Sequence, residues 1–158
     1  MIDGKIVLID ALTMNCLSYL PIELRKTIEH KCLLKVISGL NNFNLSSIEK
    51  VAWSAGKGGA DLLDVACAPD IVRLANRVSG LPICVSTIDP YDFKGALDAG
   101  ATLLEIGNFD SFYAKGRFFD AKEVLDLALT TKQLYPNVPL SVTVPHTLPL
   151  NEQAQLAL

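Results

Sequence analysis

The segment Leu62-Leu-Asp-Val-Ala-Cys-Ala-Pro69 decides the fold, because it joins a short apolar run to a turn and then to the start of a helix. Four other segments repeat this arrangement: 35–42 (KVISGLNN), 83–90 (ICVSTIDP), 103–110 (LLEIGNFD) and 140–146 (LSVTVPH). Strands that alternate with helices are typical of a parallel sheet wrapped by helices. The sequence therefore predicts an α/β protein with five parallel strands.

The helices expected between these strands have ordinary start and stop signals. The first of these helices, which follows the opening strand, is expected to begin at Ser46 or Ser47 and to end at Gly58-Gly59. The others are expected over residues 69–80, 89–100 and 120–134, with a further helix starting near Leu150. Residues 1–32 lack this alternation of strands and helices, and we interpret them as an N-terminal extension or a cover over the barrel bottom. Residues 33–158 are assigned to the N-terminal part of a barrel.

A closed barrel and a doubly wound open sheet both fit this alternation. An open sheet usually carries G-x-G-x-x-G after its first strand, whereas the turn here reads Ser38-Gly-Leu-Asn-Asn42. We therefore expect an aldolase-type (β/α)8 TIM barrel, of which this chain supplies about five β-strands and four to five helices. The missing strands predict either a piece of a longer protein or completion by self-association, because an open parallel edge is avoided in folded proteins.

Composition and charge exclude several classes of partner. The chain has 158 residues and a net charge of −3, with no basic cluster, so we expect no nucleic acid partner. The apolar run over residues 6–20 is interrupted by Asp10 and Asn15 and is too short to cross a bilayer, so we expect a soluble protein with no membrane partner. The four cysteines form no C-x-x-C or zinc spacing and are expected to be free thiols.

Four motifs together resemble one known family: 35–44 (KVISGLNNFN), 82–86 (PICVS), 105–113 (EIGNFDSFY) and 140–146 (LSVTVPH). They are similar to the hypothetical chloroplast reading frame twenty-three proteins of plastids and cyanobacteria, from about Leu33 to the C-terminus. The resemblance implies an aldolase-type barrel of roughly 250 residues, a location in the plastid stroma and no established activity. This chain stops where that family continues into three more strand–helix units, and residues 1–32 match no part of the family pattern.

Three charged side chains are expected inside the barrel. Aligning the strands by their central polar residues places Lys35, Asp64 and Glu105 on the inner face, with Ser86 and Thr143 near the same layers. The functional interpretation is a base and an electrostatic partner for proton abstraction next to a carbonyl. The structural interpretation is a buried ion pair in which the charges satisfy one another. A Schiff-base role for Lys35 is disfavoured, because nothing in the sequence lowers its pKa.

A second set of polar residues follows the strand ends, where TIM barrels hold their active sites. The ligand-lining candidates are Asn41, Ser86, Asn108, Asp110, Tyr113 and Arg117. His146, at the end of the fifth strand, is suited to acid–base work or is an ordinary loop histidine. Gly107 before Asn108 would let a ligand approach the backbone. Asp64, Glu105 and His146 offer metal-ligating atoms, but no local spacing supports a metal site and none is assigned.

The loop over residues 108–119 (NFDSFYAKGRFF) is the most distinctive segment. Its aromatic rings could stack on a planar ligand while Lys115 and Arg117 hold a phosphate or carboxylate. The alternative is that the rings pack over the barrel rim and the cations are solvated.

These features predict an enzyme that acts on a small phosphorylated or carboxylated metabolite by acid–base chemistry. Its catalytic candidates are Lys35, Asp64, Glu105 and His146. The alternatives are a non-catalytic ligand-binding or regulatory barrel, and a truncated product without activity. The cofactor is unknown from the sequence, and a homo-oligomer stays open as the way to complete the fold.

Overall fold

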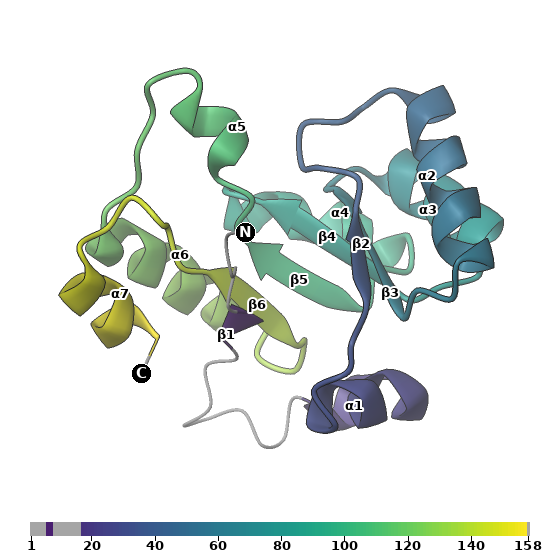
Figure 1. The fold of residues 1–158 in the computed structure, drawn as a ribbon, viewed down its shortest axis with the longest axis horizontal. Coiled ribbons are helices and arrows are strands. Elements are labelled where there is room, and N and C mark those ends of the chain that lie inside the picture. The colour runs from purple at the N-terminus through teal and green to yellow at the C-terminus, as the bar shows by residue number, and fades with distance from the viewer. Residues whose placement is uncertain (1–5, 8–16, 158) are drawn as a thin grey trace.

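The computed structural model describes residues 6–7 and 17–157. Five strands pair in parallel: β2 (Lys35–Ile37), β3 (Leu62–Ala66), β4 (Ile83–Thr87), β5 (Leu103–Ile106) and β6 (Leu140–Thr143). The two-residue strand β1 (Ile6–Val7), which was not expected, pairs antiparallel with β6, so that the sheet order is β1-β6-β5-β4-β3-β2. Figure 1 shows the five parallel strands curled into a half-barrel. The predicted fold class is thereby confirmed as an α/β fold consistent with part of a TIM barrel.

Helices follow the parallel strands in the expected alternation, with one further helix before the first of these strands and a short one inside the segment 108–119 that was expected to be a loop. They are α1 (Ile22–Glu29), α2 (Leu45–Lys57), α3 (Pro69–Ser79), α4 (Phe93–Asp98), α5 (Asp110–Tyr113), α6 (Ala121–Leu134) and α7 (Leu150–Leu156), with 3-10 turns η1 (Leu17–Tyr19) and η2 (Pro90–Asp92). The predicted start of α2 was wrong by one or two residues. Asn44 is the cap, and its side chain accepts a hydrogen bond of 3.0 Å from the backbone N–H of Ser47.

The strands have two faces with different chemistry, because alternate side chains point to opposite sides. On the outer face, Leu63, Val65 and Val85 join the main core with buried residues of the helices, including Ile48 and Val72. The opposite face carries the polar residues Asp64, Ser86 and Glu105. The outer face therefore supplies the hydrophobic stabilisation, and the inner face is left to carry chemistry.

The first two helices of the outer layer lie in close contact. A Cβ atom on Gly56 of α2 would come within 2.6 Å of the carbonyl oxygen of Ser79, at the end of α3. Only a residue without a side chain allows this approach, so Gly56 fixes how closely α2 lies against α3.

The segment before β2 covers one end of the half-barrel. Leu20, directly after η1, and Leu24 of α1 are buried in a second apolar cluster with Leu62, Cys84 and Leu103. The last three lie at the amino-terminal ends of β3, β4 and β5, and α1 lies at this end of the sheet (Figure 1). This apolar layer closes the bottom of the inner face beneath its polar residues.

Among residues 6–7 and 17–157, no helix has the length and apolar character needed to cross a bilayer.

Candidate functional site

An ion-pair network lies on the inner face, directly above the apolar bottom layer. The ammonium group of Lys35 lies 3.3 Å from the Oδ2 atom of Asp64 and donates a hydrogen bond to Oε2 of Glu105. The side chains are 7%, 1% and 3% exposed for Lys35, Asp64 and Glu105. The structure thus brings together the three charged residues that strand alignment placed inside.

Asp64 is held on both carboxylate oxygens. The hydroxyl of Ser86 donates to Oδ1 at 2.6 Å, and the amide of Asn108 donates to Oδ2 at 3.2 Å. The Asn108 amide also donates to the Ser86 hydroxyl at 3.0 Å. Asn108 has a φ of 59°, a left-handed conformation that asparagine tolerates better than most residues. This backbone conformation accompanies the placement of the Asn108 amide over Asp64.

Glu105 has three donors around it. Besides Lys35, the Thr143 hydroxyl donates to Oε1 at 3.1 Å, and the Cys84 thiol donates weakly to Oε2 at 4.0 Å. A Cβ atom on Gly107 would lie 2.8 Å from Cβ of Thr143 and 2.9 Å from Oε1 of Glu105. The space that the sequence interpretation reserved for a ligand beside Gly107 is therefore filled by Thr143 and Glu105.

The pKa values of Asp64 and Lys35 are both raised, for different physical reasons. Burial, reinforced by the neighbouring charge of Glu105, raises the pKa of Asp64 from 3.8 to about 6. Burial lowers the pKa of Lys35, but the carboxylates of Glu105 and Asp64 that contact it outweigh this effect and raise that pKa above its ordinary value. Lys35 is consequently a permanent cation, whereas Asp64 can gain or lose a proton near neutral pH. A cationic lysine cannot attack a carbonyl, which disfavours a Schiff base further.

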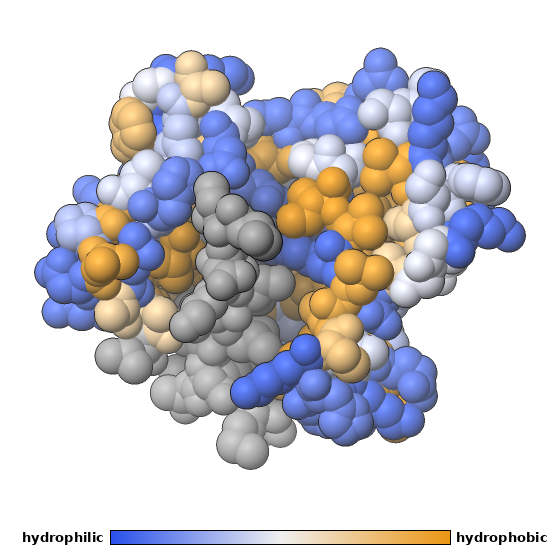
Figure 2. Space-filling view, in the orientation of Figure 1, coloured by the Kyte–Doolittle hydropathy of each residue, from blue (hydrophilic) through white to orange (hydrophobic). Residues whose placement is uncertain are grey.

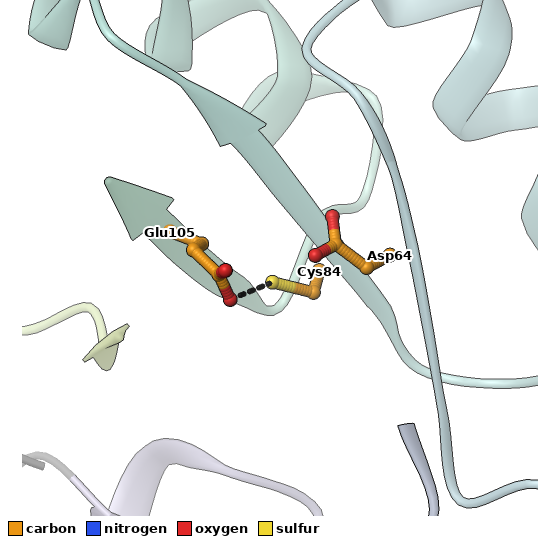
Figure 3. Close-up of side chains that lie close together, drawn as sticks. All are labelled: Asp64, Cys84 and Glu105. Carbon is orange, nitrogen blue, oxygen red and sulfur yellow. Dashed lines mark hydrogen bonds between the residues drawn. The ribbon is translucent and has the colours of Figure 1, made fainter. Parts of the chain in front are cut away.

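Asp64, Cys84 and Glu105 of this network could also serve as ligands for a metal ion (Figure 3). One carboxylate oxygen of each acid and the Sγ atom of the cysteine all lie within 4.8 Å of one another. The ammonium of Lys35 already contacts both carboxylates. Burial raises the pKa of Cys84 well above its usual value, so the thiol stays protonated. The network is therefore built around an ammonium cation, and His146 is not part of this set.

Helix α5 lies above the carboxyl ends of the strands and is tied across the opening. The Asn41 amide, in the loop after β2, donates a hydrogen bond of 2.8 Å to the Ser111 hydroxyl of α5. Two surface clefts lie elsewhere, one between β2 and α2 and the other between η2 and α6, and neither is lined by Lys35, Asp64 or Glu105. Asn41 and α5 therefore meet above the carboxyl ends of the strands, the side on which a TIM barrel binds its ligands.

His146 lies at the mouth and not in the network. Its Nδ1 atom is 3.7 Å from Oδ1 of Asp110, its side chain is 57% exposed, and its ring meets that of Tyr113 edge-on with centroids 5.1 Å apart. The structure therefore groups His146, Asp110 and Tyr113 with each other, apart from the buried carboxylates. Burial raises the pKa of Tyr113, so its hydroxyl is protonated at neutral pH.

The aromatic loop mostly packs on itself. Phe109 and Phe119 are buried with centroids 4.5 Å apart, and Tyr113 stacks on Phe118 at 5.5 Å. The Arg117 guanidinium lies 4.2 Å from the Phe119 ring centroid and pairs with Glu123 of α6. These contacts correspond to the rim-packing alternative, and they direct Arg117 toward α6.

Cys84 is the member of the network that sequence reasoning missed. It precedes Ser86 by two residues on β4, so strand alternation alone places both side chains on one face. Its apolar surroundings in the sequence concealed it, because a cysteine there resembles ordinary core.

Comparison with known proteins places the chain in a group without assigned function. Residues 20–158 match the family model described as "Protein of unknown function (DUF561)". The chain is 49% identical over 131 residues to the "Uncharacterized protein ycf23" of Cyanophora paradoxa, a match that covers 82% of this chain and 54% of the relative.

Proteins with the same description in Antithamnion sp. and Cyanidium caldarium are 42% identical over 124 residues and 33% identical over 129 residues. These matches cover 78% and 82% of this chain, and 45% and 52% of the relatives. The chain thus spans about half the length of the curated relatives it matches, which come from plastid genomes.

Proposed function

The chain belongs to the DUF561 family, whose function is unknown, and we propose that it catalyses proton transfer on a small phosphorylated or carboxylated metabolite at the inner-face network. The membership agrees with the family resemblance of its four motifs. The observation that carries the proposal is a buried carboxyl group, Asp64, whose pKa of about 6 lies near neutral and whose neighbour Lys35 is a fixed cation.

The proposed reaction abstracts a proton from a carbon atom next to a carbonyl group. The carboxylate of Asp64 accepts the proton, and the electron pair of the broken C–H bond moves onto the carbonyl oxygen. The ammonium of Lys35 stabilises the resulting oxyanion, as fixed charges do in a water-poor site. Return of the proton from Asp64 to the same or another carbon completes the cycle.

The other residues have supporting roles in this proposal. Glu105 holds Lys35 in place and keeps its charge, because it accepts a hydrogen bond from the ammonium. Ser86 and Asn108 orient the Asp64 carboxylate through their hydrogen bonds. His146, at the mouth, stays a prediction as a second proton-transfer group, and Asn41, Asp110 and Tyr113 stay predictions as ligand contacts.

The setting of this chemistry is part of the proposal. An inner face that carries charged residues above an apolar floor fits a complete (β/α)8 barrel with the reaction near the carboxyl ends of its strands. Relatives from plastid genomes support the plastid stroma as the location.

The test is proton exchange in D2O. The protein is incubated with mixtures of phosphorylated and carboxylated metabolites that have a carbonyl group, and deuterium incorporation is followed by NMR. We expect incorporation into one class of compound, and a loss of roughly 10²–10⁴-fold in the Asp64→Asn variant, the usual contribution of a positioned base. The control is Asp98→Asn, an exposed carboxylate in an ion pair with Lys94 on α4.

The competing function is ligand binding without turnover. Calorimetric titration of the same mixtures separates the two. A compound that binds with no deuterium incorporation, equally in the native chain and in Asp64→Asn, would assign the barrel to binding and contradict the enzymatic proposal.

A further inference from the structure

Strand β2 forms an open edge of the sheet. It pairs only with β3 among the described strands, while the opposite end of the sheet carries the antiparallel β1. The backbone groups on the free side of β2 are thus available to another strand.

Apolar side chains flank this edge. Leu34 and Ile37 are 51% and 49% exposed, and Phe43, in the loop that follows β2, is 60% exposed. Figure 2 shows hydrophobic side chains gathered over β2 and the adjoining side of α2. Exposed apolar surface next to an unpaired strand is typical of an interaction site.

A cleft of about 330 Å³ lies between β2 and α2. Its lining includes Leu34, directly before β2, Val36 of β2, and Lys50, Val51, Ser54 and Ala55 of α2. Most of these residues are apolar, and Lys50 supplies a positive charge. The outer face of β2 therefore offers room for apolar side chains of a neighbouring element, beside a residue that can pair with an acidic group.

The length of the relatives indicates which element fits there. This chain covers 54% of the Cyanophora paradoxa protein and 45% of the Antithamnion protein, so about half of each lies outside the match. A closed barrel of this type has eight strands, in which the first strand pairs in parallel with the last and a helix covers the junction. The open edge and the cleft are the two surfaces that such a strand and helix would bury.

A second copy of this chain fits the site less well. Two copies related by a twofold axis through β2 would pair this three-residue strand with itself in antiparallel fashion. Neither half-barrel would be closed by that arrangement, and neither cleft would receive a helix that follows a parallel strand.

We propose that the β2 edge and its cleft bind a parallel strand and its helix from the half of the ycf23-type chain that this chain does not match. That half is the single occupant proposed for this surface, and the test supplies it as a separate polypeptide. The proposal concerns assembly and is independent of the chemistry proposed for the inner face.

The test mixes this chain with a polypeptide that contains the part of the Cyanophora paradoxa relative outside its match. Binding is measured by calorimetry, and the mass of the complex by light scattering. We expect a one-to-one complex that Leu34→Glu weakens by roughly tenfold or more, a loss of about 1.4 kcal/mol of binding free energy. Leu129→Glu on α6 is the matched control, since Leu129 is 52% exposed and Leu34 is 51% exposed, and we expect its affinity to stay within about twofold.

Thermal unfolding of each variant shows whether it folds, and Ser54→Arg, an exposed change in the cleft, replaces Leu34→Glu if that variant unfolds. The proposal is overturned if the two polypeptides do not associate, or if both leucine variants bind as the native chain does. It is also overturned if the chain alone forms a dimer that Leu34→Glu dissociates, because the occupant is then a second copy.

Discussion

Lys35 of β2 and Glu105 of β5 are joined by an ion pair, although β3 and β4 lie between their strands. Three strand spacings of about 4.8 Å would separate them by roughly 14 Å across a flat sheet. Curling of the sheet shortens this separation and turns both side chains toward the same interior. The curvature that defines the half-barrel is therefore also what assembles the candidate site.

Removal of the cation is expected to destabilise the protein strongly. Lys35→Met leaves two buried carboxylates without a counter-charge, which costs about 3–5 kcal/mol of unfolding free energy for a broken buried pair. Urea unfolding measures the loss. The control is Lys94→Met, which breaks an exposed pair with Asp98 and is expected to leave the unfolding free energy nearly unchanged. A loss at Lys35 no larger than that at Lys94 would contradict a buried network.

The double variant Lys35→Met with Glu105→Gln isolates the pair. It removes the charge of one acid together with the cation, so we expect it to be more stable than Lys35→Met alone. Additive effects of the two substitutions would show that the residues do not interact in solution.

The stability should depend on pH through Asp64. Its pKa is 3.8 in an unfolded chain and about 6 in the fold, so between these values the folded protein holds a proton that the unfolded chain releases. Folding is thus favoured as the pH falls from about 6 to 3.8, and the ionised state above pH 6 costs up to about 3 kcal/mol.

The unfolding free energy of the native chain minus that of Asp64→Asn is therefore expected to increase as the pH is lowered from 7 to 4. Subtracting the variant removes the opposite slope that ordinary surface carboxylates contribute. Parallel pH profiles for the two proteins would show that the pKa of Asp64 is not raised.

A methyl group at Gly107 should disturb the network without removing any of its charges. Gly107→Ala places a Cβ atom against Thr143 and Glu105, and overpacking of this kind costs about 1–3 kcal/mol. Gly95→Ala in α4 is the control, because its Cβ atom would approach only two side-chain atoms of Pro69, at 3.1 and 3.9 Å. Thermal unfolding compares the two, and equal midpoints would mean that the space beside Gly107 is open.

The contact of Asn41 with Ser111 should restrain α5. Asn41→Ala removes one exposed hydrogen bond, so we expect a global cost of only about 0.5–1.5 kcal/mol. Hydrogen exchange by mass spectrometry should show faster exchange in peptides covering α5, with little change in β3 and β4. Asn76→Ala, on α3, is the control for loss of an exposed asparagine. Equal hydrogen exchange of α5 in both variants would contradict the restraint by Asn41.

Local sequence patterns were sufficient to predict the parallel strands and to identify the main charged residues of the candidate site. The apolar runs around Leu63 and Val85 marked the strands, and strand alternation placed Lys35, Asp64 and Glu105 on one face. These features depend on spacing along single segments, which the sequence contains directly. Whether the three residues act as a proton-transfer site is still a prediction.

Other features depend on the way distant segments meet. The tie between Asn41 and Ser111 requires the curvature of the sheet, and no local pattern encodes it. His146 lies outside the network because β6 ends at Thr143 and the chain has turned by the time it reaches the imidazole. From the sequence, the rings of Phe109 and Phe119 could have stacked on a ligand, but in the fold they are buried against each other.

The chain's single tryptophan, Trp53 of α2, is 58% exposed and lies on the side of that helix opposite the residues that line the cleft beside β2, which recur at positions 50, 51, 54, 55 and 58. An indole in water emits at longer wavelength than one against apolar surface, so a polypeptide that fills the cleft alone is expected to leave the emission unchanged. A shift toward the blue would instead report a polypeptide that reaches the outer side of α2. Intrinsic fluorescence therefore distinguishes coverage of the sheet edge from coverage of the helix behind it.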